Sequence, residues 1–231
     1  MLNAITTHLE IDVMQAMELE AAINMAQTHK MPAIIVHQDL VATAIVLRSI
    51  KRAQFKIITP IDWPRGDTYG MAKMTGLTHD ALSSDGFEIM LTAKEHPNEI
   101  KAEAKAISSF IKQHLSPICE IRFVLGTTIR DIDVCIKMAE VMSSIPAPAM
   151  LRMDHHTKSQ QTKASVEAHN RVLATIKAVT AVPLKASGNI TSLRIAEAIE
   201  APRLAVSVKQ AEAIIQDIKR GVSQEPASIE N

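Results

Sequence analysis

The sequence predicts an α/β protein that closes into a single (β/α)8 barrel, the TIM-barrel architecture. Along its 231 residues, eight short apolar runs rich in β-branched residues alternate with longer amphipathic segments, which is the pattern of βα units on a parallel sheet. Most of the runs are apolar throughout, as expected for strands buried on both faces. The length suits one barrel around one core, so residues 1–220 are expected to form one domain.

The expected elements follow one another in a regular order. The expected strands are Ala4–His8, Pro32–His37, Phe55–Asp62, Phe87–Ala93, Cys119–Gly126, Pro148–Asp154, Val182–Gly188 and Leu204–Val208. The expected helices are Val13–Thr28, Leu40–Arg52, Asn98–His114, Ile132–Ser143, Gln160–Val179, Ser192–Glu200 and Lys209–Arg220. Asp39 and Ser192 stand where a side-chain oxygen can cap a helix, so both are predicted N-cap residues.

Two stretches are expected to be less regular. The crossover Asp67–Gly86 contains Gly70 and Gly76, and glycine weakens a helix. Residues 221–231 are polar and show no periodicity. They are expected to form a frayed C-terminal tail.

The same alternation of strands and helices could also build an open, doubly wound sheet. Eight similar units favour closure into a barrel. In addition, the first expected strand leads through Thr6, Thr7 and His8 into an acidic segment, without the glycine-rich turn of a dinucleotide-binding fold.

The composition argues against several classes of function. Lys plus Arg number 25 and Asp plus Glu number 25, so the formal net charge is zero and offers no field for nucleic acid or anionic membranes. Cys119 and Cys135 match neither a zinc pair nor a redox motif. Glu10 and Asp12 interrupt the N-terminal segment before a signal peptide could form, and no apolar run reaches the roughly 20 residues of a membrane span. We expect a cytoplasmic protein whose partner is a small molecule.

Polar residues lie at or near the carboxyl ends of the expected strands, where a βα barrel builds its active site. They are His8, His37, Asp62, Glu88, Thr127, Arg152, Asp154, His155, His156, Lys185, Ser187 and Ser207. An inert barrel mouth does not require such a mixture.

Lys185 is the most informative of these residues, because it lies inside the apolar strand Val182–Gly188. Burial of a lysine is costly, and burial and a nearby cation such as Arg152 both disfavour the charged ammonium form. A neutral amine can attack a carbonyl, so Lys185 is a predicted nucleophile. The alternative is a structural ion-pair network in which Lys185 and Arg152 neutralise Glu88 and Asp154.

The turn after this strand is a predicted site for an anion. Ser187, Gly188 and Asn189 end the strand and a helix begins at Ser192, so backbone N–H groups and a helix N-terminus can approach a phosphate. Ser207 can add a hydroxyl from the last strand. The alternative is that Gly188 only makes the turn.

Four motifs resemble the deoxyribose-phosphate aldolase family, in the same order and along nearly the whole chain. The clearest is Leu184–Ile190 (LKASGNI), which is similar to the family's seventh-strand lysine and phosphate-binding turn. The others are Ile5–Thr7 in strand one, with Thr6 as a substrate-binding residue, Pro32–Val36 in strand two, and Trp63–Gly66 (WPRG) after strand three.

The resemblance implies a class I aldolase, which joins or splits carbon–carbon bonds through a lysine Schiff base, needs no metal or other cofactor, and uses a phosphorylated deoxysugar. The sequence departs from the family at central positions. Arg152 stands where the family has its strand-six Schiff-base lysine, and an arginine cannot form that imine. Glu88 replaces an aspartate, Ala4 stands in place of the strand-one aspartate, and Asn189 replaces the second glycine of the phosphate turn.

The leading hypothesis is a lyase in which Lys185 has become the nucleophile beside Arg152, with Glu88 transferring protons. Substrate oxygens would be oriented by Asp154 or His155, and an anionic group would be held by Ser187, Gly188, Asn189 and Ser207. The competing hypothesis is a repurposed aldolase-fold protein that binds a phosphorylated or sugar-like ligand, or a protein partner, without aldol chemistry.

A third hypothesis is a metal site. It would use Asp154, His155 or His156 together with Glu88, Asp62 or His37. Neighbouring histidines on a strand point to opposite faces, and no spaced histidine pair is present in the sequence, so this site is disfavoured. Homo-oligomerisation is compatible with the family but is not indicated by the residues themselves.

Overall fold

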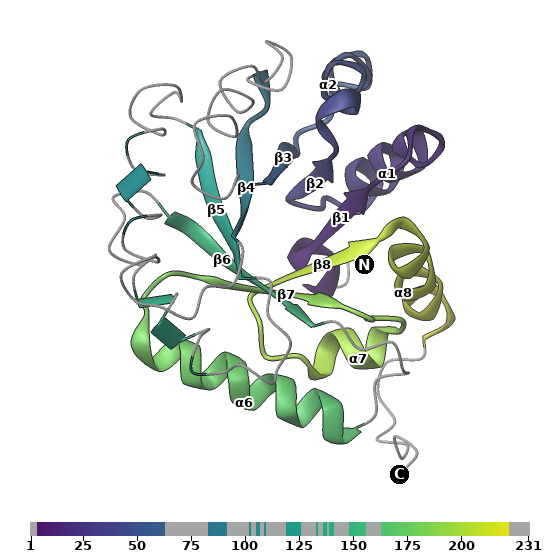
Figure 1. Ribbon diagram of the computed structural model, residues 1–231. Helices are drawn as coiled ribbons and strands as arrows, with labels where there is room; N and C mark the ends of the chain where they lie inside the picture. The colour runs from purple at the N-terminus through teal and green to yellow at the C-terminus, as the bar shows by residue number, and fades with distance from the viewer. Residues whose placement is uncertain are drawn as a thin grey trace.

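The computed structural model forms a closed barrel of eight parallel strands with helices around its outside (Figure 1). The structure describes residues 4–62, 83–91, 119–125, 148–155 and 163–221, together with isolated positions between 102 and 140. Each strand pairs in parallel with its neighbours in sequence, and the last strand pairs with the first to close the barrel. The predicted (β/α)8 architecture is therefore confirmed.

The strands are β1 (Leu9–Val13), β2 (Ala33–Val36), β3 (Lys56–Asp62), β4 (Gly86–Leu91), β5 (Glu120–Leu125), β6 (Pro148–His155), β7 (Leu184–Gly188) and β8 (Arg203–Ser207). The α-helices are α1 (Ala16–Thr28), α2 (Val41–Ile50), α6 (Lys163–Val179), α7 (Leu193–Ala198) and α8 (Val208–Arg220). Two short 3-10 helices are η1 (Ala4–His8) and η2 (Gln38–Leu40). None of the helices in the described part of the chain is both long and apolar enough to span a membrane.

Strand one is the main correction to the predicted elements. The residues expected to form it, Ala4–His8, form η1, and the true strand is Leu9–Val13. The other seven strands lie within two residues of their predicted bounds. LEIDV alternates apolar and acidic residues, so it differs from the mostly apolar runs by which the other strands were predicted.

The correction moves two predicted site residues to the opposite end of the barrel. Thr6 lies in η1 and His8 ends it, so both precede β1 at the amino-terminal end. The His8 ring is hydrogen bonded to the Pro202 carbonyl at 2.8 Å, and Arg203 donates to the Thr7 carbonyl at 2.6 Å. Thr6 is therefore not at the carboxyl-terminal mouth, where its predicted substrate contact would have to be made.

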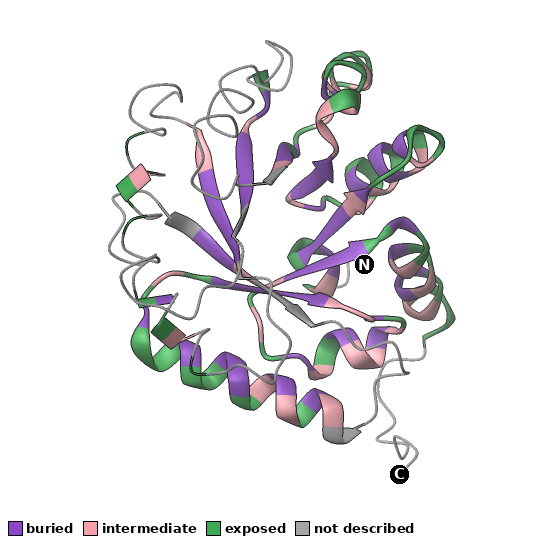
Figure 2. Ribbon diagram, viewed as in Figure 1, coloured by how far each residue is buried: buried purple, intermediate pink, exposed green. Residues whose placement is uncertain are grey.

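The two faces of each strand meet different environments, because successive side chains point to opposite sides of a sheet. Leu9, Ile11 and Val13 of β1 belong to the large core between the sheet and the helices. Among the residues that the structure describes, a separate small cluster of buried apolar residues consists of Ala33, Ile35, Ile58 and Ala205. In Figure 2 the strands are mostly buried, while the helices expose one face.

The N-caps were predicted with mixed success. Ser192 caps α7 by accepting a hydrogen bond from the Ile195 amide at 3.3 Å, as predicted. Asp39 does not cap a helix, because it lies within η2 and the residue before α2 is Leu40. The expected helices Asn98–His114 and Ile132–Ser143 fall largely outside the described residues, as do the WPRG turn, most of Asp67–Gly86 and the tail after residue 221.

Candidate functional site

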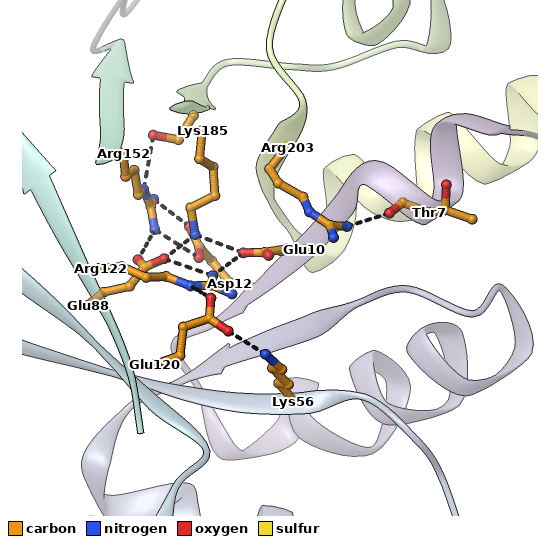
Figure 3. Close-up of polar contacts among 11 residues, drawn as sticks. Thr7, Glu10, Asp12, Lys56, Glu88, Glu120, Arg122, Arg152, Lys185 and Arg203 are labelled. Atoms are coloured by element: carbon orange, nitrogen blue, oxygen red, sulfur yellow. Dashed lines mark hydrogen bonds and ion pairs between the residues drawn. The ribbon is translucent and has the colours of Figure 1, made fainter. Parts of the chain in front are cut away.

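Six charged side chains from five strands meet inside the barrel (Figure 3). We call them the barrel network: Glu10, Asp12, Glu88, Arg122, Arg152 and Lys185. They come from β1, β4, β5, β6 and β7. The six described members comprise three carboxylates and three cations, so their charges balance.

Lys185 is fully buried, and its amine lies between two carboxylates. Nζ donates to Glu10 Oε2 at 2.8 Å and also to Glu88 Oε1. The amine therefore makes ion pairs with two carboxylates, which matches part of the structural ion-pair alternative. The nucleophilic role of Lys185 stays a prediction.

Arg152 lies closer to solvent and holds Asp12. Its NH1 and NH2 donate to the two Asp12 carboxylate oxygens at 3.2 and 2.8 Å. NH1 also donates to Glu88 Oε2 at 2.9 Å, and Nε donates to Ser187 Oγ at 3.1 Å. The side chains of Asp12 and Arg152 are 21% and 13% exposed, compared with 1% for Glu88. A solute entering the network would meet the Asp12–Arg152 pair before Lys185.

Arg122 continues the network on the other side of Glu10. Its NH1 donates to Glu10 Oε2 at 2.6 Å, and its Nε donates to Glu120 Oε1 at 2.6 Å. Lys56 in turn donates to Glu120 Oε2 at 2.5 Å. Among the residues that the structure describes, the other Glu10 oxygen, Oε1, is buried without a hydrogen-bond partner.

Two carboxylates of the network have pKa values shifted in opposite directions. Burial alone would raise the pKa of Glu88, but the charges of Lys185 and Arg152 lower it to about 2. Burial raises the pKa of Asp12 above its ordinary value, and this effect exceeds the lowering by Arg152. Glu88 therefore stays ionised, while Asp12 takes up a proton more readily. Such a divergence is typical of an acid–base pair in an enzyme.

The predicted anion site after β7 is partly engaged within the protein. Gly188 has a positive φ of 137°, and its carbonyl accepts from Gln210 at 3.1 Å. Ser207 caps α8 by accepting from the Gln210 amide at 3.3 Å, and Asn189 follows the strand directly. Since β7 and β8 are neighbours, the turn and Ser207 lie at the same end of the barrel.

Asp154 and His155 are paired with Ser187 and Gly188 in the register of β6 and β7. Their side chains lie outside the described residues, as do those of Asp62, Thr127 and His156. Within the described part of the chain, no group of three His, Cys, Asp or Glu residues could hold a metal ion.

Three members of the barrel network were not predicted as site residues: Glu10, Asp12 and Arg122. Ala4 lies in η1 and precedes β1, so the prediction that it stands at the acidic position of strand one was wrong; β1 itself carries Glu10 and Asp12. The alternation of apolar and acidic residues in LEIDV was the signal that could have identified both. It indicates a strand with one polar face.

No protein-family model matches the chain, and no curated protein sequence matches it. Several solved structures match the chain in fold. A Coccidioides immitis protein provisionally assigned as a deoxyribose-phosphate aldolase is 14% identical, with a TM-score of 0.72 over 95% of this chain and 87% of the other. An aldolase named QR15 is 15% identical, with a TM-score of 0.70 over 96% and 99%. The tetrameric deoxyribose phosphate aldolase of Aeropyrum pernix is 12% identical, with a TM-score of 0.69 over 93% and 91%. The chain therefore has the fold of these aldolases.

Proposed function

We propose that the protein is a lyase that acts on a small carbonyl compound carrying an anionic group, with the barrel network as its reacting groups. The observation that carries this proposal is the Asp12–Arg152 pair on the solvent side of Lys185 and Glu88. The aldolase fold of the similar structures supports a lyase over other classes.

The chemistry follows from the charges. Cleavage of a carbon–carbon bond beside a carbonyl moves an electron pair onto the carbonyl oxygen, so a fixed cation at that oxygen lowers the barrier. Arg152 supplies this cation. Asp12 removes the proton from the hydroxyl on the departing fragment and returns it to the carbon of the resulting enolate, so no net proton is consumed. In this mechanism Lys185 stays charged and keeps Glu88 ionised.

The anionic group of the substrate is assigned to the end of β7 and β8. Ser187, Gly188 and Asn189 offer small side chains and backbone N–H groups there, and Ser207 offers a hydroxyl. Asp154 and His155 on β6 are in register with the first two of these residues, and one of the two would orient substrate oxygens.

A second candidate is an imine mechanism at Lys185, favoured by one observation. The buried Glu10 Oε1, which has no hydrogen-bond partner in the described structure, can accept the proton that the ammonium must lose before attack. The neutral amine then adds to the carbonyl and water leaves, so that the imine becomes the electron sink in place of the carbonyl oxygen.

A single set of assays separates these mechanisms. The protein is incubated with a panel of hydroxy-aldehydes and hydroxy-ketones, turnover is measured, and borohydride is added before mass spectrometry. Turnover without an adduct, lost in Arg152→Met and Asp12→Asn, supports the enolate mechanism. A reduced adduct on Lys185, absent in Lys185→Met and kept in the surface control Lys209→Met, supports the imine. Thermal stabilisation by a ligand without turnover of any compound would instead identify a binding barrel.

A further inference from the structure

The guanidinium of Arg152 is occupied by a carboxylate of the protein itself. NH1 and NH2 each donate to a different oxygen of Asp12, at 3.2 and 2.8 Å (Figure 3). This two-pronged geometry is the one by which arginine binds any carboxylate, including that of a ligand. Asp12 is also the most exposed carboxylate of the barrel network, with 21% of its side chain accessible.

The surroundings of Asp12 are balanced in charge. Among the side chains that the structure describes on the elements around it, the charged groups are Arg152 on β6, Glu88 on β4, Lys185 on β7 and Glu10 on its own strand. On the neighbouring strands β2 and β8, its register partners are the uncharged Ile35 and Ser207. Because the described network contains three carboxylates and three cations, one more anion fits only if an existing carboxylate loses its charge.

We propose that Asp12 is an internal substitute for the carboxylate of a 2-oxo acid, which displaces it from Arg152 as Asp12 takes up a proton. The inference rests on the imine mechanism of the proposed function, because a protonated Asp12 and an Arg152 that holds the ligand carboxylate cannot serve the enolate mechanism. It names the substrate class of the same site and assigns the substrate's carboxylate to Arg152. The raised pKa of Asp12 supports it, since proton uptake by this residue is easier than by an ordinary aspartate.

A carboxylate matches this position better than a phosphate does. The two Asp12 oxygens accept separately from NH1 and NH2, and a planar ligand carboxylate can reproduce both contacts. A monoanion that replaces the Asp12 charge leaves the network neutral, whereas a phosphate dianion would add a negative charge beside Glu88. The keto group next to the bound carboxylate would then lie near the groups that act on a carbonyl.

Binding of a 2-oxo acid at Arg152 should weaken as the pH rises, because Asp12 must take up a proton. If one proton is taken up for each ligand bound, affinity falls about tenfold for each pH unit above the pKa of Asp12. Asp12→Asn removes the competing charge, so the ligand binds more tightly and without proton uptake. Asp12→Ala removes the side chain itself, so acetate can occupy the vacated position on Arg152.

Isothermal titration calorimetry on the full chain tests these expectations with pyruvate, acetate and inorganic phosphate. Titrations in two buffers with different ionisation enthalpies count the protons taken up. For pyruvate we expect uptake of about one proton in the wild type, none in Asp12→Asn, and at least tenfold tighter binding in that variant. Acetate should raise the melting temperature of Asp12→Ala but not that of the wild type. Asp39→Asn, a change at an aspartate with 76% of its side chain exposed, is the matched control and should behave as the wild type.

Any of these results would overturn the inference: equal or weaker pyruvate binding in Asp12→Asn, phosphate binding that exceeds pyruvate binding, or pyruvate binding to the wild type without proton uptake. The last result requires no variant, so it stands even if a substitution prevents folding. The absence of binding of pyruvate to the wild type and of acetate to Asp12→Ala would also overturn it. Because these assays measure binding, a lack of turnover with intact proton-linked binding would refute the lyase proposal and leave the carboxylate site standing.

Discussion

Replacement of Arg122 by methionine should destabilise the fold more than any surface change. Its side chain is 3% exposed and contacts Glu10 and Glu120 at 2.6 Å and Glu88 at 3.4 Å. Removal of one partner of a buried ion pair costs about 3–5 kcal/mol. Because Glu10 and Glu88 both keep Lys185 as a partner, we expect the lower end, about 3 kcal/mol. For a chain of this length that loss lowers Tm by roughly 6–12 °C.

Urea unfolding followed by circular dichroism measures this loss, with thermal melts as a second readout. The matched control is Arg220→Met, at the exposed end of α8, which should change stability by less than about 0.5 kcal/mol. The double variant Glu10→Gln with Arg122→Met should be more stable than the sum of the two single losses predicts, by about 1 kcal/mol or more. A loss below about 1 kcal/mol in Arg122→Met, or strict additivity in the double variant, would refute the reasoning.

Three further changes test other parts of the structure. Gly86→Ala would place a Cβ 2.5 Å from the Glu120 carbonyl oxygen and 2.9 Å from Ile58 Cδ1. Urea unfolding should therefore show a free energy of unfolding that is about 1–3 kcal/mol lower than in the wild type. An unchanged urea midpoint would contradict this close approach. The folded-state pKa of Glu88 is about 2, below its ordinary 4.5, so its ionised form stabilises the protein above pH 4.5 and this contribution, on the order of 3 kcal/mol, is lost as the pH falls toward 2. Glu88→Gln should therefore flatten the stability profile between these pH values, and an unaltered acid profile would argue against the shift. Burial, together with the charges of Asp85 and Glu120, raises the pKa of Cys119 to about 11. Alkylation of the Cys119 thiol by iodoacetamide at pH 8, measured on the peptide that contains it, should therefore be about 100-fold slower in the folded than in the unfolded protein. Similar rates in the two states would argue against the raised pKa.

The predictable parts of the fold were those that depend on local pattern. The apolar runs that became β2 to β8 are short, continuous and separated by amphipathic segments, so their burial on both faces could be recognised from neighbouring residues alone. β1 could not be recognised by the same rule. Its inward positions carry Glu10 and Asp12, which a strand tolerates only where cations from other strands lie opposite them.

The candidate site also has a part that the sequence predicted and a part that it did not. Glu88, Arg152, Lys185 and Ser187 were predicted because each is a polar residue in an apolar run. Their pairing was not predicted, and neither was the place of Arg122. Which acid lies beside which base is set by the register of strands that are remote in sequence.

The amino-acid sequence alone determined that this chain builds eight βα units and that one amine is buried in the seventh strand. Only the tertiary structure decided the partners of that amine. Closure of the barrel brings Glu10, 175 residues away in sequence, and Glu88, 97 residues away, into contact with Lys185. The energy of a buried charge depends on its partners in space rather than on its neighbours in the chain, so no local pattern could have revealed it.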